Sequence, residues 1–321
     1  MDFCPSVYEH AARVIGRTPW DVSRDGALLA KGHIEAYRLY RHRPVVVGID
    51  IYDLEAEAYG AAVQRPSGHG IPAIIRFPSS SVDDLLQLRP FDPETAGRVP
   101  VILGAAQAVA RACPDADVRV PVAGPFSVAA NLLGLEELLF AVATQPDRVK
   151  AALLHLVQGQ IQLCRAIATR GLGIAFFESA AAPPLLSPAQ FRAVELPALR
   201  VMLQAVTAIT GSPPAFIMGG DTTPIVEAIM ETGTGYVCCP SETDQQAFMA
   251  KMEAWPQVMV RVNMNPAPLI AGDDESIRRE IERVLELSRG RQRVCIGTGV
   301  LPYEVDPGTV LRTRQMVLSS R

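Results

Sequence analysis

The segment that decides the fold is Ala215-Phe216-Ile217-Met218-Gly219-Gly220-Asp221-Thr222-Thr223-Pro224. It begins with an apolar run, continues with two glycines, a carboxylate and two hydroxyl side chains, and ends at a proline that opens an amphipathic stretch. This order predicts a strand, a tight turn and the start of a helix. In parallel α/β folds, side chains converge at the carboxyl ends of the strands. Asp221 is therefore placed either to take part in chemistry or to cap the helix.

The same alternation of strands and helices continues on both sides of that segment. Strands are predicted at residues 45–51, 118–123, 173–177, 215–217, 236–239, 258–263 and 294–296. Their continuous apolar runs are typical of parallel strands covered on both faces. Because no change of composition marks a linker, we predict one domain over residues 1–321, an α/β barrel of the (β/α)8 TIM type. Residues 1–44 are predicted to form an N-terminal helical extension.

The eighth strand of the barrel has no clear pattern. We place it near residues 71–75, inside a Pro- and Gly-rich stretch from 61 to 90, or expect the barrel to be irregular there. Loops of that length often carry function. A doubly wound open sheet is the alternative fold, but no G-x-G-x-x-G motif follows the first strand and no P-loop is present.

Composition narrows the class of partner. The 321 residues are 49% hydrophobic and 20% charged, with a net charge of −4. These values give no reason to expect nucleic acid or a membrane surface as a partner, and they favour a small soluble molecule. No run approaches the roughly 18 apolar residues of a spanning helix, so we predict a cytoplasmic protein. Six cysteines without a C-x-x-C pair indicate reduced thiols.

Polar side chains stand where a barrel would gather them at one rim. They are Asp50, Glu178, Ser179, Asp221, Asn263 and Thr298. Carboxylates that share a cavity shift each other's pKa values apart, so that one serves as an acid and another as a base. Each residue taken alone has an alternative structural role, because barrel rims also use Asp and Asn as caps.

Four further residues are weak candidates for a metal site. Cys238 and Cys239 end a predicted strand, Cys295 lies on a later strand, and His69 lies in the long loop. Thiolates bind zinc, but buried cysteine is also a common apolar filler and no spacing here is diagnostic. The remaining histidines, His10, His33, His42 and His155, are expected to be solvated.

Several motifs taken together resemble the uroporphyrinogen decarboxylase superfamily. The resemblance covers residues 45–310 and is carried by Gly124-Pro125-Phe126-Ser127, Phe177-Glu178-Ser179, Leu186-Ser187-Pro188, Gly220-Asp221-Thr222, Asn263-Met264-Asn265-Pro266 and Gly297-Thr298-Gly299-Val300-Leu301-Pro302. It implies a (β/α)8 barrel. It also implies either decarboxylation or corrinoid-linked methyl transfer, because this superfamily contains enzymes of both kinds.

The match to the decarboxylases is incomplete. Asp50 stands where they hold the pyrrole N–H groups, and Ser179 matches a serine of their substrate cleft. Asn131 replaces their tyrosine, Thr298 replaces their histidine, and their arginine-rich segment has no counterpart before Asp50. A multiply charged porphyrinogen requires such cations, so decarboxylation of that substrate is not expected.

The match to the zinc-dependent methyltransferases is also incomplete. The resemblance places Ile217, Gly219 and Gly299 at the three positions where those enzymes have zinc ligands. We therefore expect no zinc and no tightly bound cofactor.

The leading hypothesis is methyl or one-carbon transfer, with cobalamin chemistry supplied by a corrinoid protein that docks on the rim. Asp50, Glu178 or Asp221 would protonate the leaving group. Tyr52 and Asn263 would orient the substrate, and Asn131, Ser179 and Thr298 complete its expected contacts. A decarboxylase (lyase) of a small or tetrapyrrole-like carboxylate and a non-catalytic tetrapyrrole- or partner-binding barrel are the alternatives. The resemblance also allows for a homodimer, although no apolar pattern selects an interface.

Overall fold

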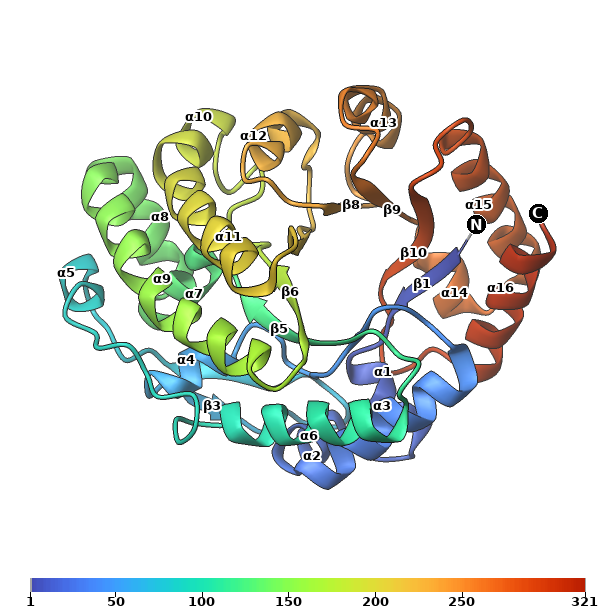
Figure 1. Ribbon diagram of the computed structural model, residues 1–321, viewed down its shortest axis with the longest axis horizontal. Helices are drawn as coiled ribbons and strands as arrows, with labels where there is room; N and C mark the ends of the chain where they lie inside the picture. Colours follow the sequence, from blue (N-terminus) through green and yellow to red (C-terminus); the bar gives the residue numbers. More distant parts are fainter. Residues whose placement is uncertain (1, 321) are drawn as a thin grey trace.

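The computed structural model describes residues 2–320 and confirms the predicted barrel. Eight parallel strands form one sheet in the order β1-β10-β9-β8-β7-β6-β5-β2. β1 and β2 lie at the two ends of this order, and Figure 1 shows the nearly closed ring with helices around it. The strands are β1 (Asp2–Ser6), β2 (Val45–Val46), β5 (Val118–Ala123), β6 (Gly173–Phe177), β7 (Ala215–Ile217), β8 (Tyr236–Cys239), β9 (Met259–Asn263) and β10 (Val294–Val300).

The eighth strand is β1, so its predicted position near residues 71–75 is wrong. Asp2 pairs with Cys295 and Cys4 with Gly297 in parallel register. Residues 71–75 instead overlap β4 (Ala73–Arg76), which pairs with β3 (Ala62–Gln64) in a separate antiparallel hairpin. The first strand has no sequence signal because it contains a proline and is short. Pairing with β10, rather than local propensity, makes it a strand.

The structure differs from the predicted N-terminal helical extension, because residues 2–6 form the barrel strand β1 and the helices after it connect β1 to β2. Three helices follow that strand: α1 (Glu9–Val14), α2 (Pro19–Arg24) and α3 (Gly26–Tyr40). The Asp25 side chain accepts hydrogen bonds from the first amides of α3, as an N-cap residue does.

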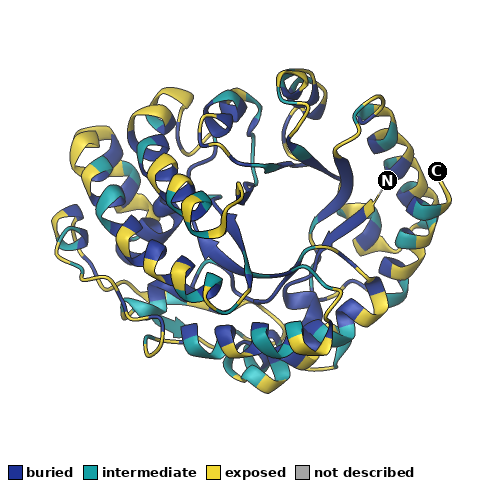
Figure 2. Ribbon diagram, in the orientation of Figure 1, coloured by how far each residue is buried: buried dark blue, intermediate teal, exposed yellow. Residues whose placement is uncertain are grey.

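The remaining helices form the outer layer of the barrel. Figure 2 shows that they bury the face turned to the sheet and expose the opposite face. They are α4 (Leu54–Ala58), α5 (Val82–Leu85), α6 (Val99–Ala112), α7 (Pro125–Leu133), α8 (Leu135–Thr144), α9 (Pro146–Ala168), α10 (Pro188–Gln190), the π-helical turn η1 (Phe191–Glu195), α11 (Leu196–Thr210), the 3-10 turn η2 (Thr223–Ile225), α12 (Val226–Met230), α13 (Gln245–Lys251), the 3-10 turn η3 (Met252–Ala254), α14 (Ala267–Ala271), α15 (Asp274–Leu287) and α16 (Pro307–Ser319).

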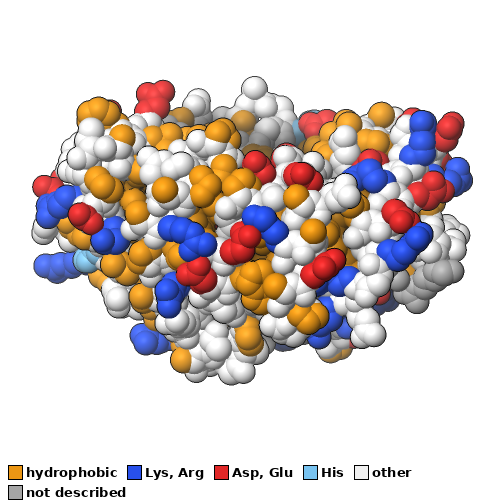
Figure 3. All heavy atoms as spheres, turned by 90° about the horizontal axis from the view of Figure 1, so that it is seen from above, with side chains coloured by type: hydrophobic (Ala, Val, Ile, Leu, Met, Phe, Trp, Pro, Cys, Tyr) orange, Lys and Arg blue, Asp and Glu red, His pale blue; other side chains and the backbone are white. Residues whose placement is uncertain are grey.

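One outer helix is apolar enough to resemble a membrane span. The stretch Pro188–Thr210 passes that test by length and composition, and α7 with α8 passes it only as a pair bent by 113°. In the barrel, α11 packs against α9, and 44% of its apolar window is buried. The barrel therefore accounts for its apolar side chains. Figure 3 shows acidic and basic side chains interspersed on the one face that it draws.

Candidate active site

A short hydrogen-bonded group lies at the carboxyl ends of β2 and β6. The Tyr52 hydroxyl lies 2.6 Å from the Ser179 Oγ, and the Asn131 amide donates to the Tyr52 carbonyl at 2.8 Å. The Tyr52 ring also meets Phe177 edge to face. Burial raises the pKa of Tyr52, which keeps the phenol protonated near neutral pH. Three predicted substrate-binding residues, Tyr52, Asn131 and Ser179, are thus brought together.

Asp221 lies in the loop after β7 and is half-buried. It follows Gly220, whose φ of +82° is in the left-handed region that favours glycine. The Thr243 hydroxyl donates a hydrogen bond to Asp221 Oδ1 at 2.7 Å. The N-cap residue of η2 is Thr222, and its side chain makes no capping hydrogen bond. Asp221 therefore does not serve as the N-cap that the sequence left as an alternative.

The rim continues from Ser179 to the loop that carries Asp221. A side chain at Gly219 would lie 3.7 Å from the Ser179 Oγ, and one at Gly220 would lie 3.0 Å from the Ala182 Cβ. The ends of β6 and β7 are therefore in close contact, and the two glycines keep this part of the rim open.

Asn263 lies deeper, inside the barrel, beside an arginine that the sequence analysis missed. The Asn263 amide donates to Cys238 Sγ at 3.2 Å, and Arg261 Nη2 lies 3.6 Å from the same sulfur. Arg261 is only 5% exposed, and no carboxylate of residues 2–320 forms an ion pair with it. A guanidinium stays charged in proteins, so the barrel interior holds an uncompensated cation.

Gly297 creates the space for these two side chains. A Cβ at this position would overlap Asn263 Oδ1 and the aliphatic part of Arg261. The next residue, Thr298, lies outside the site: its hydroxyl accepts a hydrogen bond from the Ser6 amide at 3.3 Å and donates to the Gly299 carbonyl at 2.8 Å. Thr298 therefore joins β1 to β10, and its side chain is fully buried there.

Asp50 is held in a buried ion pair. Arg98 Nη1 and Nη2 donate to its two oxygens at 2.9 and 2.5 Å, and Arg98 also pairs with Glu57. Burial alone would lower the pKa of Arg98, but Asp50 and Glu57 raise it above its ordinary value. A carboxylate locked by a bidentate arginine is poorly placed to transfer a proton to a substrate.

Glu178 is fully buried between β6, α7 and η1. The Ser127 amide and hydroxyl both donate to its carboxylate, and a Cβ at Gly124 would overlap that carboxylate. These contacts explain the Gly124-Pro125-Phe126-Ser127 motif. Glu178 thus lies behind the barrel wall, while its neighbour Ser179 reaches the rim.

A second buried carboxyl group, that of Glu195 in η1, lies near Glu178, and the two groups influence each other's pKa values. Its oxygens accept no hydrogen bond by the usual distance and angle limits among residues 2–320. Burial and the nearby Glu178 raise the pKa of Glu195 well above its usual value, and burial also raises the pKa of Glu178. Each shift favours the protonated form, so the pair retains a proton to a higher pH than two isolated glutamates would.

The four weak metal candidates do not gather at one place. Residues 2–320 contain no group of three or more His, Cys, Asp or Glu side chains able to hold a metal ion. Cys238 faces the barrel interior and Cys239 belongs to the core under the helices. His69, in the β3–β4 hairpin, stacks on Tyr303 at a ring distance of 4.1 Å.

Three of the other histidines are buried, so the prediction that they are solvated is wrong. Burial lowers the pKa of His10 and of His33 to about 4, and that of His42 to about 3. His10 bonds the Tyr40 hydroxyl, and His33 accepts from the Gly48 amide at 3.1 Å. His155 is half-buried and contacts the Leu88 carbonyl. His10 and His33 lie on helix faces that turn towards the core, and His42 is buried in the segment between α3 and β2.

Three functional neighbours were missed: Arg98, Glu195 and Arg261. Arg261 carries a usable signal, because it is a charge at an inward position of β9, between Val260 and Val262. Glu195 directly precedes the apolar helix α11, which is a weaker signal. Arg98 lies outside any periodic pattern, and only the fold places it beside Asp50.

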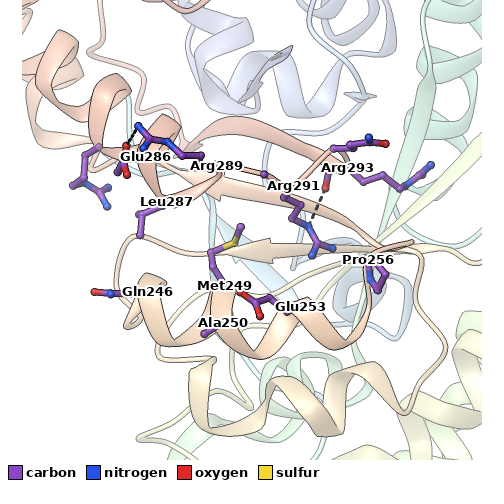
Figure 4. A pocket seen from close by; sticks show the side chains of 13 residues that line it. Gln246, Met249, Ala250, Glu253, Pro256, Glu286, Leu287, Arg289, Arg291 and Arg293 are labelled. Atoms are coloured by element: carbon purple, nitrogen blue, oxygen red, sulfur yellow. Dashed lines mark hydrogen bonds and ion pairs between the residues drawn. The ribbon is translucent and has the colours of Figure 1, made fainter.

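A cavity of about 1080 Å³ lies away from this rim, between α13 and the segment after α15. Figure 4 shows its lining, in which Arg291 bonds the Arg293 carbonyl. Arg291 also donates to the carbonyls of Met252, Trp255 and Val258, so its side chain stabilises the end of η3. These hydrogen bonds give Arg291 a structural role, so its presence in the cavity does not by itself indicate a ligand.

Known proteins resemble the chain along almost its whole length. The family model described as uroporphyrinogen decarboxylase (URO-D) matches residues 4–316. A methyltransferase from Methanosarcina mazei has a similar structure, with a TM-score of 0.82 and 19% identity over 99% of this chain and 94% of that one. A B12-independent methionine synthase from Shewanella has a TM-score of 0.51 and 9% identity over 92% and 86%. At these identities the likeness shows the fold alone. No curated protein sequence matches the chain.

Proposed function

The chain belongs to the uroporphyrinogen decarboxylase family, and on that premise we propose that it transfers a methyl group of a small molecule, with a corrinoid protein as partner. The observation that carries the proposal is the position of Asp221, which is half-buried in the loop after β7. Of the three carboxylates predicted to be catalytic, Asp50 is bound by Arg98 and Glu178 is buried behind the wall. Only Asp221 is half-buried at the rim, with Thr243 as a neutral partner.

In this proposal Asp221 gives or accepts the proton at the substrate oxygen or nitrogen that loses or gains the methyl group. The Thr243 hydroxyl fixes its carboxylate at 2.7 Å. Tyr52 and Ser179 hold the substrate beside it, because their hydroxyls form the nearest fixed polar group on the rim. The corrinoid would supply the cobalt that donates or takes the methyl group.

The likeness to a methyltransferase over 99% of the chain supports the shared fold and does not choose between methyl transfer and decarboxylation. Zinc does not fit the positions that the family uses for it. Ile217, Gly219 and Gly299 carry no donor atom in their side chains, so no step is assigned to zinc.

Decarboxylation is the second candidate, and Arg261 favours it. A buried guanidinium without a carboxylate partner is suited to a substrate that brings its own carboxylate. On that alternative, a carboxylate entering from the rim would pass Asn263 and approach Arg261.

The deciding experiment supplies the purified chain with methylated aryl ethers and amines and reads the absorbance of cob(I)alamin as it is consumed. Carbon dioxide release is measured in parallel with small carboxylic acids. Asp221→Asn is expected to lower methyl transfer by about 10²–10⁴-fold. Glu242→Gln, an exposed carboxylate nearby in the chain, is the matched control and should keep activity.

Two results would overturn the proposal. Carbon dioxide release without cobalamin consumption would transfer the assignment to decarboxylation. An Asp221→Asn protein as active as the wild type would remove Asp221 from the chemistry. If substrates bind to wild type and variant alike and none turns over, the barrel is a binding protein.

A further inference from the structure

A second cavity lies at the end of the barrel opposite the rim. Its volume is about 590 Å³, within the range of roughly 300–1,000 Å³ that is usual for small-molecule sites. It is formed where β1, β8, β9 and β10 begin, and it is completed by the end of α3 and by α16. None of the residues assigned to the proposed chemistry lines it.

Arginines dominate the charge of this cavity. Arg41, Arg43, Arg119, Arg293 and Arg314 line it, together with the two acids Asp2 and Asp117. They come from α3, the turn before β2, β5, the turn before β10, and α16, so the fold gathers them from distant parts of the sequence. Such convergence differs from a run of basic residues on one helix, which is usually a solvated face.

Part of this positive charge is compensated within the protein, and part is not. Arg119 pairs with Asp117 at 2.7 Å, and Arg41 and Arg43 bond Asp115 through its carboxylate and its carbonyl. Arg293 and Arg314 form no ion pair or side-chain hydrogen bond among residues 2–320. These two guanidinium groups are therefore available to an anion.

The rest of the lining suits an apolar group. Phe3, Met259 and Leu318 contribute apolar surface, and Tyr236 and Cys295 lie at the beginning of β8 and β10. The Tyr236 hydroxyl lies 3.8 Å from Cys295 Sγ. A ligand that carries negative charge at one end and an apolar part at the other would match this lining.

We propose that this cavity binds a small anionic molecule that carries a phosphate group or several carboxylates. Guanidinium groups bind both kinds of anion through paired N–H donors, which favours the forked geometry of arginine over lysine. The proposal is independent of the proposed methyl transfer, because it uses a different end of the barrel and different residues.

The test measures binding by isothermal titration calorimetry with pyrophosphate and with citrate, at constant ionic strength set by sodium chloride. We expect saturable binding of at least one of them in the millimolar range or tighter. Preference for pyrophosphate identifies a phosphorylated ligand, and preference for citrate identifies a polycarboxylate. No saturable binding of either compound would refute the proposal.

Variants then locate the site. The double variant Arg293→Gln/Arg314→Gln is expected to weaken binding by about tenfold or more, since each charge-assisted contact is lost. Arg165→Gln/Arg200→Gln removes the same charge from exposed positions on α9 and α11 and is the matched control. An equal loss in both double variants would show a general charge effect and would overturn the assignment. Circular dichroism of all variants checks that each is folded.

Discussion

Asp50 and Glu178 each follow an apolar strand of the same barrel, and both are buried, yet their surroundings are opposite. Asp50 faces Arg98, which binds both of its oxygens. Glu178 faces Glu195, a second carboxyl group, and is stabilised by Ser127. The same sequence pattern thus places one carboxylate against a bidentate arginine, which opposes the rise in pKa that burial causes, and the other beside a second carboxyl group. The difference teaches that partners from distant segments, not the strand end itself, decide the chemistry of an acid.

The largest expected effect comes from removing the cation of the first region. Arg98→Met leaves the buried Asp50 without its bidentate partner, whereas the half-buried Glu57 keeps Arg24, so the free energy of unfolding should fall by about 3–5 kcal/mol. Urea denaturation followed by circular dichroism measures it. Arg38→Met, which removes an exposed arginine paired only with Glu35, is the control. A loss below about 1 kcal/mol, typical of exposed pairs, would show that the Asp50 region is not held by this ion pair.

A second prediction tests the packing around Glu178 by adding a methyl group at Gly124. Gly124→Ala would drive a methyl group into the Glu178 carboxylate, and we expect a loss of about 1–3 kcal/mol in the free energy of unfolding. Gly104→Ala is a matched control, because no atom lies within 4 Å of the added Cβ in α6. That control should be neutral or stabilising by up to about 1 kcal/mol. Equal behaviour of the two variants would contradict the close packing of Gly124 on Glu178.

The smallest expected effect is the pH dependence of stability that arises from protonation of Glu178 and Glu195. The pKa values of Glu178 and Glu195 are raised in the folded protein, so the folded state binds protons more tightly than the unfolded chain. This pair therefore stabilises the fold fully below the unfolded pKa, and the contribution is lost as the pH rises through the folded pKa values.

Glu195→Gln removes the second ionisable group of that pair. The variant should gain stability relative to wild type as the pH rises above about 4.5, the ordinary pKa of a glutamate. Thermal unfolding at several pH values between about 4.5 and 8 measures the trend. Glu282→Gln controls for the loss of an exposed carboxylate. A constant difference at all pH values would show that the two carboxyl groups do not share a proton.

The sequence predicted the barrel because seven of its strands have long apolar runs, but β1 is made by pairing with β10 and could not be read locally. It likewise placed Tyr52, Asn131 and Ser179 near one another. It could not tell that Asp50 and Glu178 are occupied by other side chains, because Arg98 and Glu195 lie 48 and 17 positions away in the chain. Thr298 was expected at the rim because it lies near the end of a predicted strand. The end of a strand locates the backbone, but the direction of each side chain depends on the exact register of the strand.

The pairing of β1 with β10 has a consequence for biosynthesis. Ser6 and Thr298 are bonded although 292 residues separate them. On the ribosome, the first strand leaves the exit tunnel long before its only neighbour in the sheet exists. Until then its peptide groups are an unpaired edge, the kind of surface that recruits other chains. Closure between β1 and β10 is therefore a long-range event that waits for the synthesis of β10.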